Sequence, residues 1–224
     1  VADSNYLYVA EGGNGTQGGR VRRFELTDVN ASATLIAGLH WPAAIALDST
    51  DLYVADLGRG YDGTIQRVQN ASLATPGARK VLATGQHFPN SLTIPPASSV
   101  ASSTVFFRTE EDGETSLRTV SKFGGKVGVF AGLASNVHPH LVTDNNHLYV
   151  LATPLDSRGF WGTSFSSGAP GVNVLGFPLD GQPAELVTRF SSDANPRGLA
   201  LKNDQLFISF PAGVKKVDVS APSG

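Results

Sequence analysis

The residues best suited to chemistry in this sequence are two histidines on either side of a proline. His138 and His140 stand two positions apart, so in extended chain their imidazoles point the same way, as paired metal ligands do. Two imidazoles without placed carboxylates form an incomplete ligand set. The alternative is a pair of half-buried loop histidines bonded to backbone carbonyls, with Pro139 interrupting any regular strand. The pair is therefore a candidate site for a divalent metal, beside a purely structural interpretation.

Three glycines, Gly13, Gly15 and Gly18, have the spacing of a dinucleotide-binding loop. Such a loop must follow a strand and open a helix, because the helix N-terminus holds the pyrophosphate. The next segment, RVRRFEL at 20–26, alternates like a strand, so we interpret 11–19 as a hairpin loop. The sequence also lacks a nucleophile elbow, a phosphate loop and an H-E-x-x-H motif, so nucleophilic catalysis has no support.

Composition narrows the class of protein. The 224 residues have a formal net charge of −2 and no block of Lys and Arg, which argues against a nucleic-acid partner. No apolar run approaches the length of a membrane span. The absence of Cys excludes disulfides and thiolate metal sites. Low charge and a surface rich in Ser, Thr, Asn and Gly favour an extracellular or periplasmic location.

Five segments of the chain resemble one another: NYLYVAEG, TDLYVADLG, STVFFRTE, NHLYVLAT and DQLFISFP. Each carries an aromatic residue at the same place, and these residues are Tyr8, Tyr53, Phe106, Tyr149 and Phe207. Their spacings of 45, 53, 43 and 58 residues are typical of propeller blades or helical arrays. Val, Tyr, Phe, Ile and Thr at period two, bounded by Gly, favour strands over helices.

The flanking segments repeat as well. A Pro-led stretch precedes four of the aromatic segments, and a Gly-containing loop with another strand follows each of them. With a further short strand, each unit has strands A (Pro-led), B (aromatic), C and D. We therefore predict an all-β fold, a β-propeller of about five four-stranded blades with incomplete strands at both termini. Residues 1–224 form one propeller domain in this interpretation, alone or within a longer chain.

The strand order places the D–A and B–C loops at one end of the propeller, here called the loop face. His40, His87, His138 and His140 all fall in D–A connections or just after them. The residue after each Pro is expected at the start of the innermost strand, facing the axis. The predicted ligand-binding residues at this mouth are Asn90, His140, Arg197, Trp41, His40 and His87.

The fourth B–C loop, at 153–171, is far longer than its counterparts and carries Phe160, Trp161 and Phe165. Long loops in compact domains are usually functional or disordered. Exposed aromatics between glycines suit a lid that stacks on a ligand such as a sugar, so Trp161 joins the predicted ligand-binding residues. The alternative is that the aromatics pack back on a neighbouring blade.

Residues 38–68, GLHWPAAIALDSTDLYVADLGRGYDGTIQRV, resemble the NHL-repeat consensus, and the other units resemble it more loosely. Such propellers include enzymes, scaffolds and ligand binders. There is a distant resemblance to gluconolactonase-like propellers, whose Pro-Asn-Gly segment is similar to FPNSL here and implies Asn90 as a metal ligand. Arg197 stands where that family would need an acid, and its opening Glu segment is absent. Virginiamycin B lyase-like propellers are also distantly similar, but no motif here matches their site.

Two functional hypotheses follow from this sequence. The leading one is a ligand- or protein-binding module, with a small molecule, carbohydrate or protein on the loop face. The alternative is a metal-dependent hydrolase, lactonase or lyase at the channel mouth. Its residues would be Asn90, His138, His140 and Arg197, with the first three as metal ligands.

Overall fold

The structure is a computed structural model of the chain. It describes residues 1–13, 18–28, 30–59, 62–111, 114–133, 137–152, 171–191 and 196–220. In these ranges there are eighteen strands and no helix, which confirms the predicted all-β fold.

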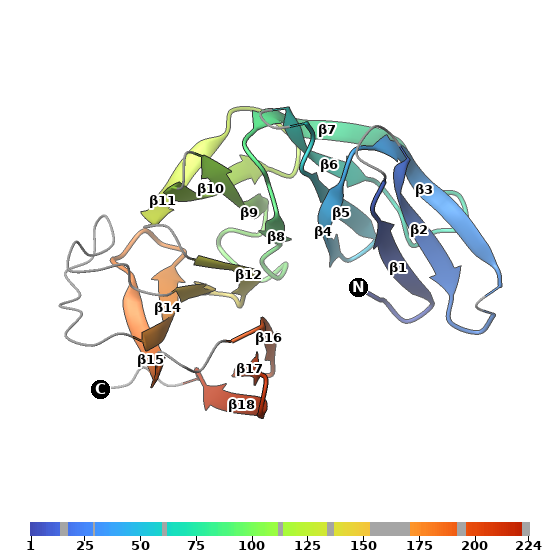
Figure 1. Ribbon diagram of the computed structural model, residues 1–224. Helices are drawn as coiled ribbons and strands as arrows, with labels where there is room; N and C mark the ends of the chain where they lie inside the picture. Colours follow the sequence, from blue (N-terminus) through green and yellow to red (C-terminus); the bar gives the residue numbers. More distant parts are fainter. Residues whose placement is uncertain are drawn as a thin grey trace.

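The strands form five antiparallel sheets that follow one another along the chain, and each sheet is one blade (Figure 1). Blade 1 consists of β1 (Tyr6–Glu11), β2 (Gly19–Glu25) and β3 (Ser32–Leu39). Blade 2 consists of β4 (Pro42–Asp48), β5 (Asp51–Asp56), β6 (Gly63–Val68) and β7 (Arg79–Gln86). Blade 3 consists of β8 (Ser91–Thr93), β9 (Thr104–Glu111), β10 (Glu114–Ser121) and β11 (Gly128–Leu133).

The last two blades differ in strand number. Blade 4 consists of β12 (Val137–Thr143), β13 (His147–Ala152), β14 (Gly171–Pro178) and β15 (Glu185–Ser191). Blade 5 consists of β16 (Gly198–Lys202), β17 (Gln205–Phe210) and β18 (Gly213–Asp218). The blades are arranged in an open arc, with blades 1 and 5 at its two ends (Figure 1).

The terminal blades are incomplete, as predicted. In blade 1, the place of strand A is marked by a single bridge between Ala2 and Leu7. The Tyr8 amide donates to the carbonyl of Val1 at 2.8 Å, which continues the same pairing. Blade 5 contains strands A, B and C, and no described strand pairs with the outer edge of β18.

The core lies between the blades. Side chains alternate along a strand, so the B strands of blades 1 to 4 turn their aromatic residue toward the next blade, and those of blades 2 to 5 turn the two flanking residues toward the preceding blade. Tyr8 of blade 1 belongs to one buried cluster with Leu52 and Val54 of blade 2. Three equivalent clusters join the other neighbouring blades. The repeated aromatic of the sequence is therefore the interblade contact, and each blade is stabilised by its neighbours.

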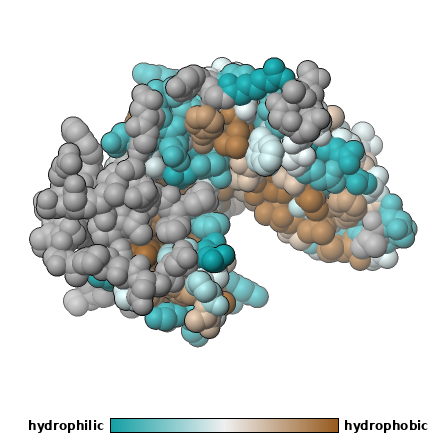
Figure 2. All heavy atoms as spheres, in the orientation of Figure 1, coloured by the Kyte–Doolittle hydropathy of each residue, from teal (hydrophilic) through white to brown (hydrophobic). Residues whose placement is uncertain are grey.

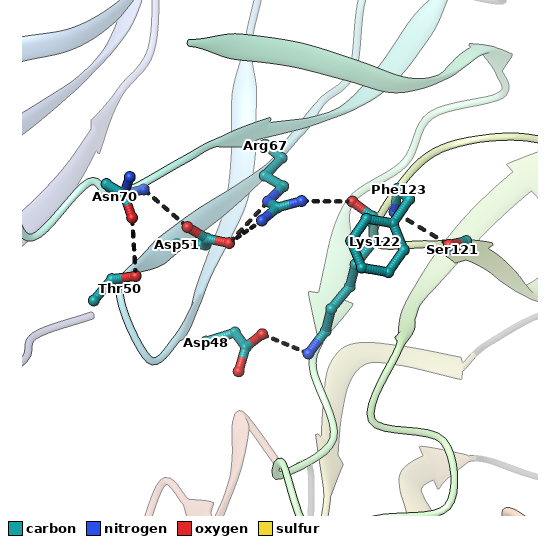
Figure 3. A network of polar contacts seen from close by, with 8 residues as sticks. All are labelled: Asp48, Thr50, Asp51, Arg67, Asn70, Ser121, Lys122 and Phe123. Carbon is teal, nitrogen blue, oxygen red and sulfur yellow. Dashed lines mark hydrogen bonds and ion pairs between the residues drawn. The ribbon is translucent and has the colours of Figure 1, made fainter. Parts of the chain in front are cut away.

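Blades 2 and 3 are also joined by a polar network at the end opposite the loop face (Figure 3). The Asp48 carboxylate pairs with Lys122 Nζ across the interface. Arg67 Nε donates to Asp51 at 2.8 Å, and its Nη1 donates to the carbonyl of Lys122 at 3.2 Å. Lys122 is nearly fully buried, so the carboxylate of Asp48 offsets the cost of taking this ammonium out of water.

Candidate ligand-binding site at the loop face

The antiparallel blades bring the B–C hairpins and the D–A connections to one end of the molecule. The pairs Glu11–Arg20 and Asp56–Thr64 lie at the B–C ends of blades 1 and 2. Gly13 and Gly18 therefore lie between two paired antiparallel strands, as expected for a hairpin connection, and the strand β2, not a helix, follows them.

Blade 2 places a buried carboxylate under the D–A connection that leads into it from blade 1. Asp56, the last residue of β5, is 4% exposed and accepts the backbone N–H groups of His40 at 3.1 Å and Trp41 at 2.6 Å. Arg59 Nε donates to His40 Nδ1 at 3.3 Å. The Trp41 side chain is 50% exposed, and its ring lies beside Gly12 of the neighbouring B–C loop. Asp56 thus holds the connection that presents an indole at the surface.

Blade 3 carries a second polar group on its side facing blade 2. His87 Nδ1 lies 3.2 Å from Glu111 Oε1, and Arg118 Nη2 lies 3.8 Å from Glu111 Oε2. The Glu110 amide donates to the carbonyl of His87 at 3.0 Å, which ties the D–A connection to β9. The carboxylate therefore sits between an imidazole and a guanidinium.

Arg108 lies on the other face of β9, the face that Phe106 turns toward blade 4. It is 5% exposed, and its Nη2 donates to Glu110 Oε2 at 3.0 Å and to Thr115 Oγ1 at 3.3 Å. Its buried Nε has no partner among the described residues. Burial lowers the pKa of the Arg108 guanidinium, and the charge of Glu110 opposes this shift.

Asn90 and Arg197 lie directly before β8 and β16, the A strands of blades 3 and 5. The Asn90 amide donates to the carbonyl of Arg108 at 3.3 Å, while its buried Oδ1 has no partner among the described residues. Arg197 is exposed, and its amide donates to the carbonyl of Ser209 at 2.8 Å. His140 is partly buried in β12.

Two predicted residues cannot be placed in this arrangement. Trp161 lies outside the described residues, and so does the side chain of His138. Across the described ranges, no group of three or more His, Asp and Glu side chains is arranged to hold a metal ion. The metal set of Asn90, His138 and His140 therefore stays a prediction.

Buried polar side chains are concentrated at the loop face. Of the eleven described residues that are polar and buried, seven lie at this end: Asp56, Gln86, Ser91, Arg108, Thr109, Thr115 and Asn173. Sequence reasoning missed Arg108, because FFRTE resembles an ordinary strand that ends in solvent. The signal was a charged residue two positions after Phe106, on the same face of an apolar strand.

A pocket of about 450 Å³ lies at the opposite end, between blades 4 and 5. Its lining includes four carboxylates, those of Asp144, Glu185, Asp204 and Asp218, and the apolar side chains of Leu186, Val187 and Val219. His147 Nε2 lies 3.4 Å from Glu185 Oε1. Sequence reasoning placed its candidate site at the other end and did not find this pocket, which needs the packing of two blades.

Comparison with solved structures identifies the fold. The chain is similar to a chain of the nidogen–laminin complex, with a TM-score of 0.66 and 15% identity over 99% of this chain and 76% of that one. It is similar to TolB from Acinetobacter baumannii, with a TM-score of 0.63 and 12% identity over 97% of this chain and 51% of that one. It is also similar to a putative 6-phosphogluconolactonase from Bacteroides uniformis, with a TM-score of 0.53 and 14% identity over 98% of this chain and 68% of that one.

These neighbours are β-propeller proteins, and the chain is a β-propeller. No protein-family model and no curated protein matches the sequence. At this level of identity the likeness concerns the fold alone. Among the described residues, no helix has the length and apolarity needed to cross a membrane.

Proposed function

We propose that this propeller is a binding module that holds a ligand or a protein partner on its loop face. The observation that carries the proposal is the concentration of buried polar side chains at that end. Burying a polar group costs free energy unless it is hydrogen-bonded, so polar groups gathered at one end of an apolar fold favour a recognition site there. Exposed Trp41 and Phe88 add apolar contact area beside them.

An exposed indole near buried polar side chains suits a ligand with a flat apolar face and hydroxyl groups, such as a carbohydrate. Binding to a carbohydrate array tests this. We expect Trp41→Ala to weaken binding about tenfold, the value of one stacking contact, while the free energy of unfolding changes little. Phe123→Ala is the matched control, because Phe123 is a similarly exposed aromatic at the opposite end. Equal loss in both variants would contradict a site at the loop face.

The alternative function is a metal-dependent hydrolase, lactonase or lyase at the channel mouth. Asn90 favours it, because a buried Oδ1 without a partner among the described residues is an acceptor that a cation could satisfy. Zinc or calcium added to metal-stripped protein should then raise the melting temperature, and Asn90→Ala should abolish the increase. Absence of any increase in the parent protein would remove this alternative.

Localisation outside the cytoplasm is part of the same proposal. It is supported by the low charge of the chain and by its content of Ser, Thr, Asn and Gly. We also propose that the five blades belong to one domain, because every neighbouring pair shares a buried cluster.

A further inference from the structure

The B strands repeat one burial pattern, and this pattern shows which blade faces are covered. In blades 2 to 5, the two residues that flank the repeated aromatic position pack against the preceding blade. All eight of these residues are 0% exposed: Leu52, Val54, Val105, Phe107, Leu148, Val150, Leu206 and Ile208. The flanking pair is thus a consistent marker for a blade on that side.

The same two positions are uncovered in blade 1. Leu7 occupies the place of Leu52 but is 41% exposed, and Val9 is partly exposed where Val54 is buried. Nearby on the same face, Phe24 is covered by the guanidinium of Arg22, whose Cζ lies 4.6 Å from the ring centroid. This face of blade 1 therefore has the residues of an interblade contact, and no blade formed by the described residues lies against it.

Blade 5 shows the complementary deficiency. The repeated aromatics of blades 1 to 4 are at most 3% exposed because each packs against the next blade. Phe207, at the same position in blade 5, is only partly buried. In Figure 2 the space between the two arms of the arc is open, and apolar residues in brown lie on the arm that includes blade 1.

We propose that the gap between blades 5 and 1 accepts one further four-stranded blade of the same repeat type. Its B strand would place an aliphatic or aromatic pair against Phe207 and an aromatic ring against Leu7 and Val9. Such a blade covers both end faces at once. It also allows a D strand to pair with the outer edge of β18, which no described strand occupies.

A second copy of this chain is the main competing occupant. Its blade 1 could stack on blade 5 with the same chemistry, but that head-to-tail contact leaves another end face open on each copy. A single blade closes the ring and covers both exposed faces. It also adds its own loops to the loop face. A second copy in the gap would be detected as a dimer or larger assembly by the mass of the protein in solution.

Thiol reactivity tests the proposal directly, because the chain has no cysteine. Leu7→Cys introduces a reporter on the open face, and Leu52→Cys is the matched control at the same position of a covered blade. Each is placed in the 224-residue chain and in a chain extended after Ser220 by a copy of residues 79–133. That copy contains one D strand and one complete blade.

In the 224-residue monomer we expect the Leu7→Cys thiol to react readily and the Leu52→Cys thiol to react at least tenfold more slowly. In the extended chain both should be slow. A slow Leu7→Cys thiol in the 224-residue monomer, or a disulfide formed between Leu7→Cys and Phe207→Cys within one chain, would show that five blades close directly and would overturn the proposal. Protection that appears only in a dimer would assign the gap to a second copy and would also overturn it.

A second extended chain controls for the failure of one particular copied blade to fold. A second extension, a copy of residues 32–86, supplies a different D strand and blade. If both extended chains fold cooperatively and the Leu7→Cys thiol stays reactive in them, the proposal is wrong. If neither extension folds onto the arc, the gap does not accept a blade of this repeat type, and the proposal is equally wrong.

Discussion

Equivalent aspartates in the A–B turns have different partners, and the difference is visible residue by residue. Asp3 and Asp144 each stand five residues before a repeated tyrosine and accept its hydroxyl at 2.7 Å. Asp48 stands at the same distance from Tyr53 but pairs with Lys122 of the next blade. The buried hydroxyl of Tyr53 is left without a partner among the described residues. The Asp48 carboxylate thus stabilises the interface between blades 2 and 3, whereas the carboxylates of Asp3 and Asp144 bind the tyrosine of their own blade.

This difference predicts that the same Tyr→Phe substitution has different effects on stability in two blades. Tyr149→Phe removes a hydroxyl bonded to the Asp144 carboxylate and should cost about 1.5–3 kcal/mol of unfolding free energy, the net value of a hydrogen bond to a charged group. Tyr53→Phe removes a buried hydroxyl that lacks such a bond, so its effect should be near zero or slightly stabilising. Urea unfolding of both variants measures the difference. Equal destabilisation would show that Tyr53 has a partner of similar strength.

Asp56 is the residue of the candidate site with the clearest structural role. Its buried carboxylate accepts two backbone N–H groups, and Asp56→Ala would leave both without that acceptor. We expect a loss of about 1–3 kcal/mol in unfolding free energy. Asp56→Asn keeps one side-chain oxygen as acceptor and should lose less. A loss for Asp56→Asn as large as that for Asp56→Ala would mean that the negative charge, and not the hydrogen bonding, matters there.

At the scale of the elements, the first residue of strand C is a close-packing point under the D–A connection. A Cβ on Gly63 would lie 2.5 Å from the carbonyl oxygen of Gln86 and 2.4 Å from Pro89 Cδ. A Cβ on Gly19 would lie 2.8 Å from both the carbonyl oxygen of Leu39 and Pro42 Cδ. The same glycine in two blades thus allows the connection to cross directly over the strand.

Gly63→Ala should therefore destabilise the protein by about 1–3 kcal/mol, since the backbone must move to admit the methyl group. Gly132→Ala in β11 is the control, because a Cβ there meets no atom within 4 Å. The melting temperatures of the two variants provide the comparison. A tolerated Gly63→Ala would show that the D–A connection of blade 2 can shift without cost.

Most elements could be predicted because each strand carries its own signal. The alternation around Tyr8, Tyr53 and Tyr149 defines strand B, and the Pro-led stretches define strand A. The partners of the polar residues could not be predicted in this way. FFRTE places Arg108 on the same face of the strand as Phe106, but it does not identify Thr115 as a partner, because that contact depends on the register of β9 and β10.

At the scale of the whole molecule, the arc has two kinds of blade. Blades 2 to 4 are covered on both faces, whereas blades 1 and 5 are each covered on one face by described residues. In repeat proteins the stability of a unit is approximately the sum of its intrinsic folding free energy and the free energies of its interfaces with neighbouring units. The terminal blades lack one interface each, so they should open first.

Hydrogen exchange measures this difference. We expect the amides of β5, β9 and β13 to be protected longest and those of β1 and β18 to exchange fastest, with opening free energies below that of global unfolding. Amides that pair within a sheet are compared, such as Tyr53 against Phe207, so that local hydrogen bonding is matched. Uniform protection across all five blades would indicate that the terminal faces are covered in solution.

The sequence by itself determined the repeating unit, the five blades of this chain and the end of the molecule at which His40, His87 and His140 lie. These follow from periodicity and strand order, which are local properties of the chain. The tertiary structure decided which polar groups are buried, that Asp48 pairs across a blade interface, that a carboxylate-lined pocket lies between blades 4 and 5, and that the arc is open. Each of these depends on side chains brought together from different blades, and no local pattern in the chain encodes such distances.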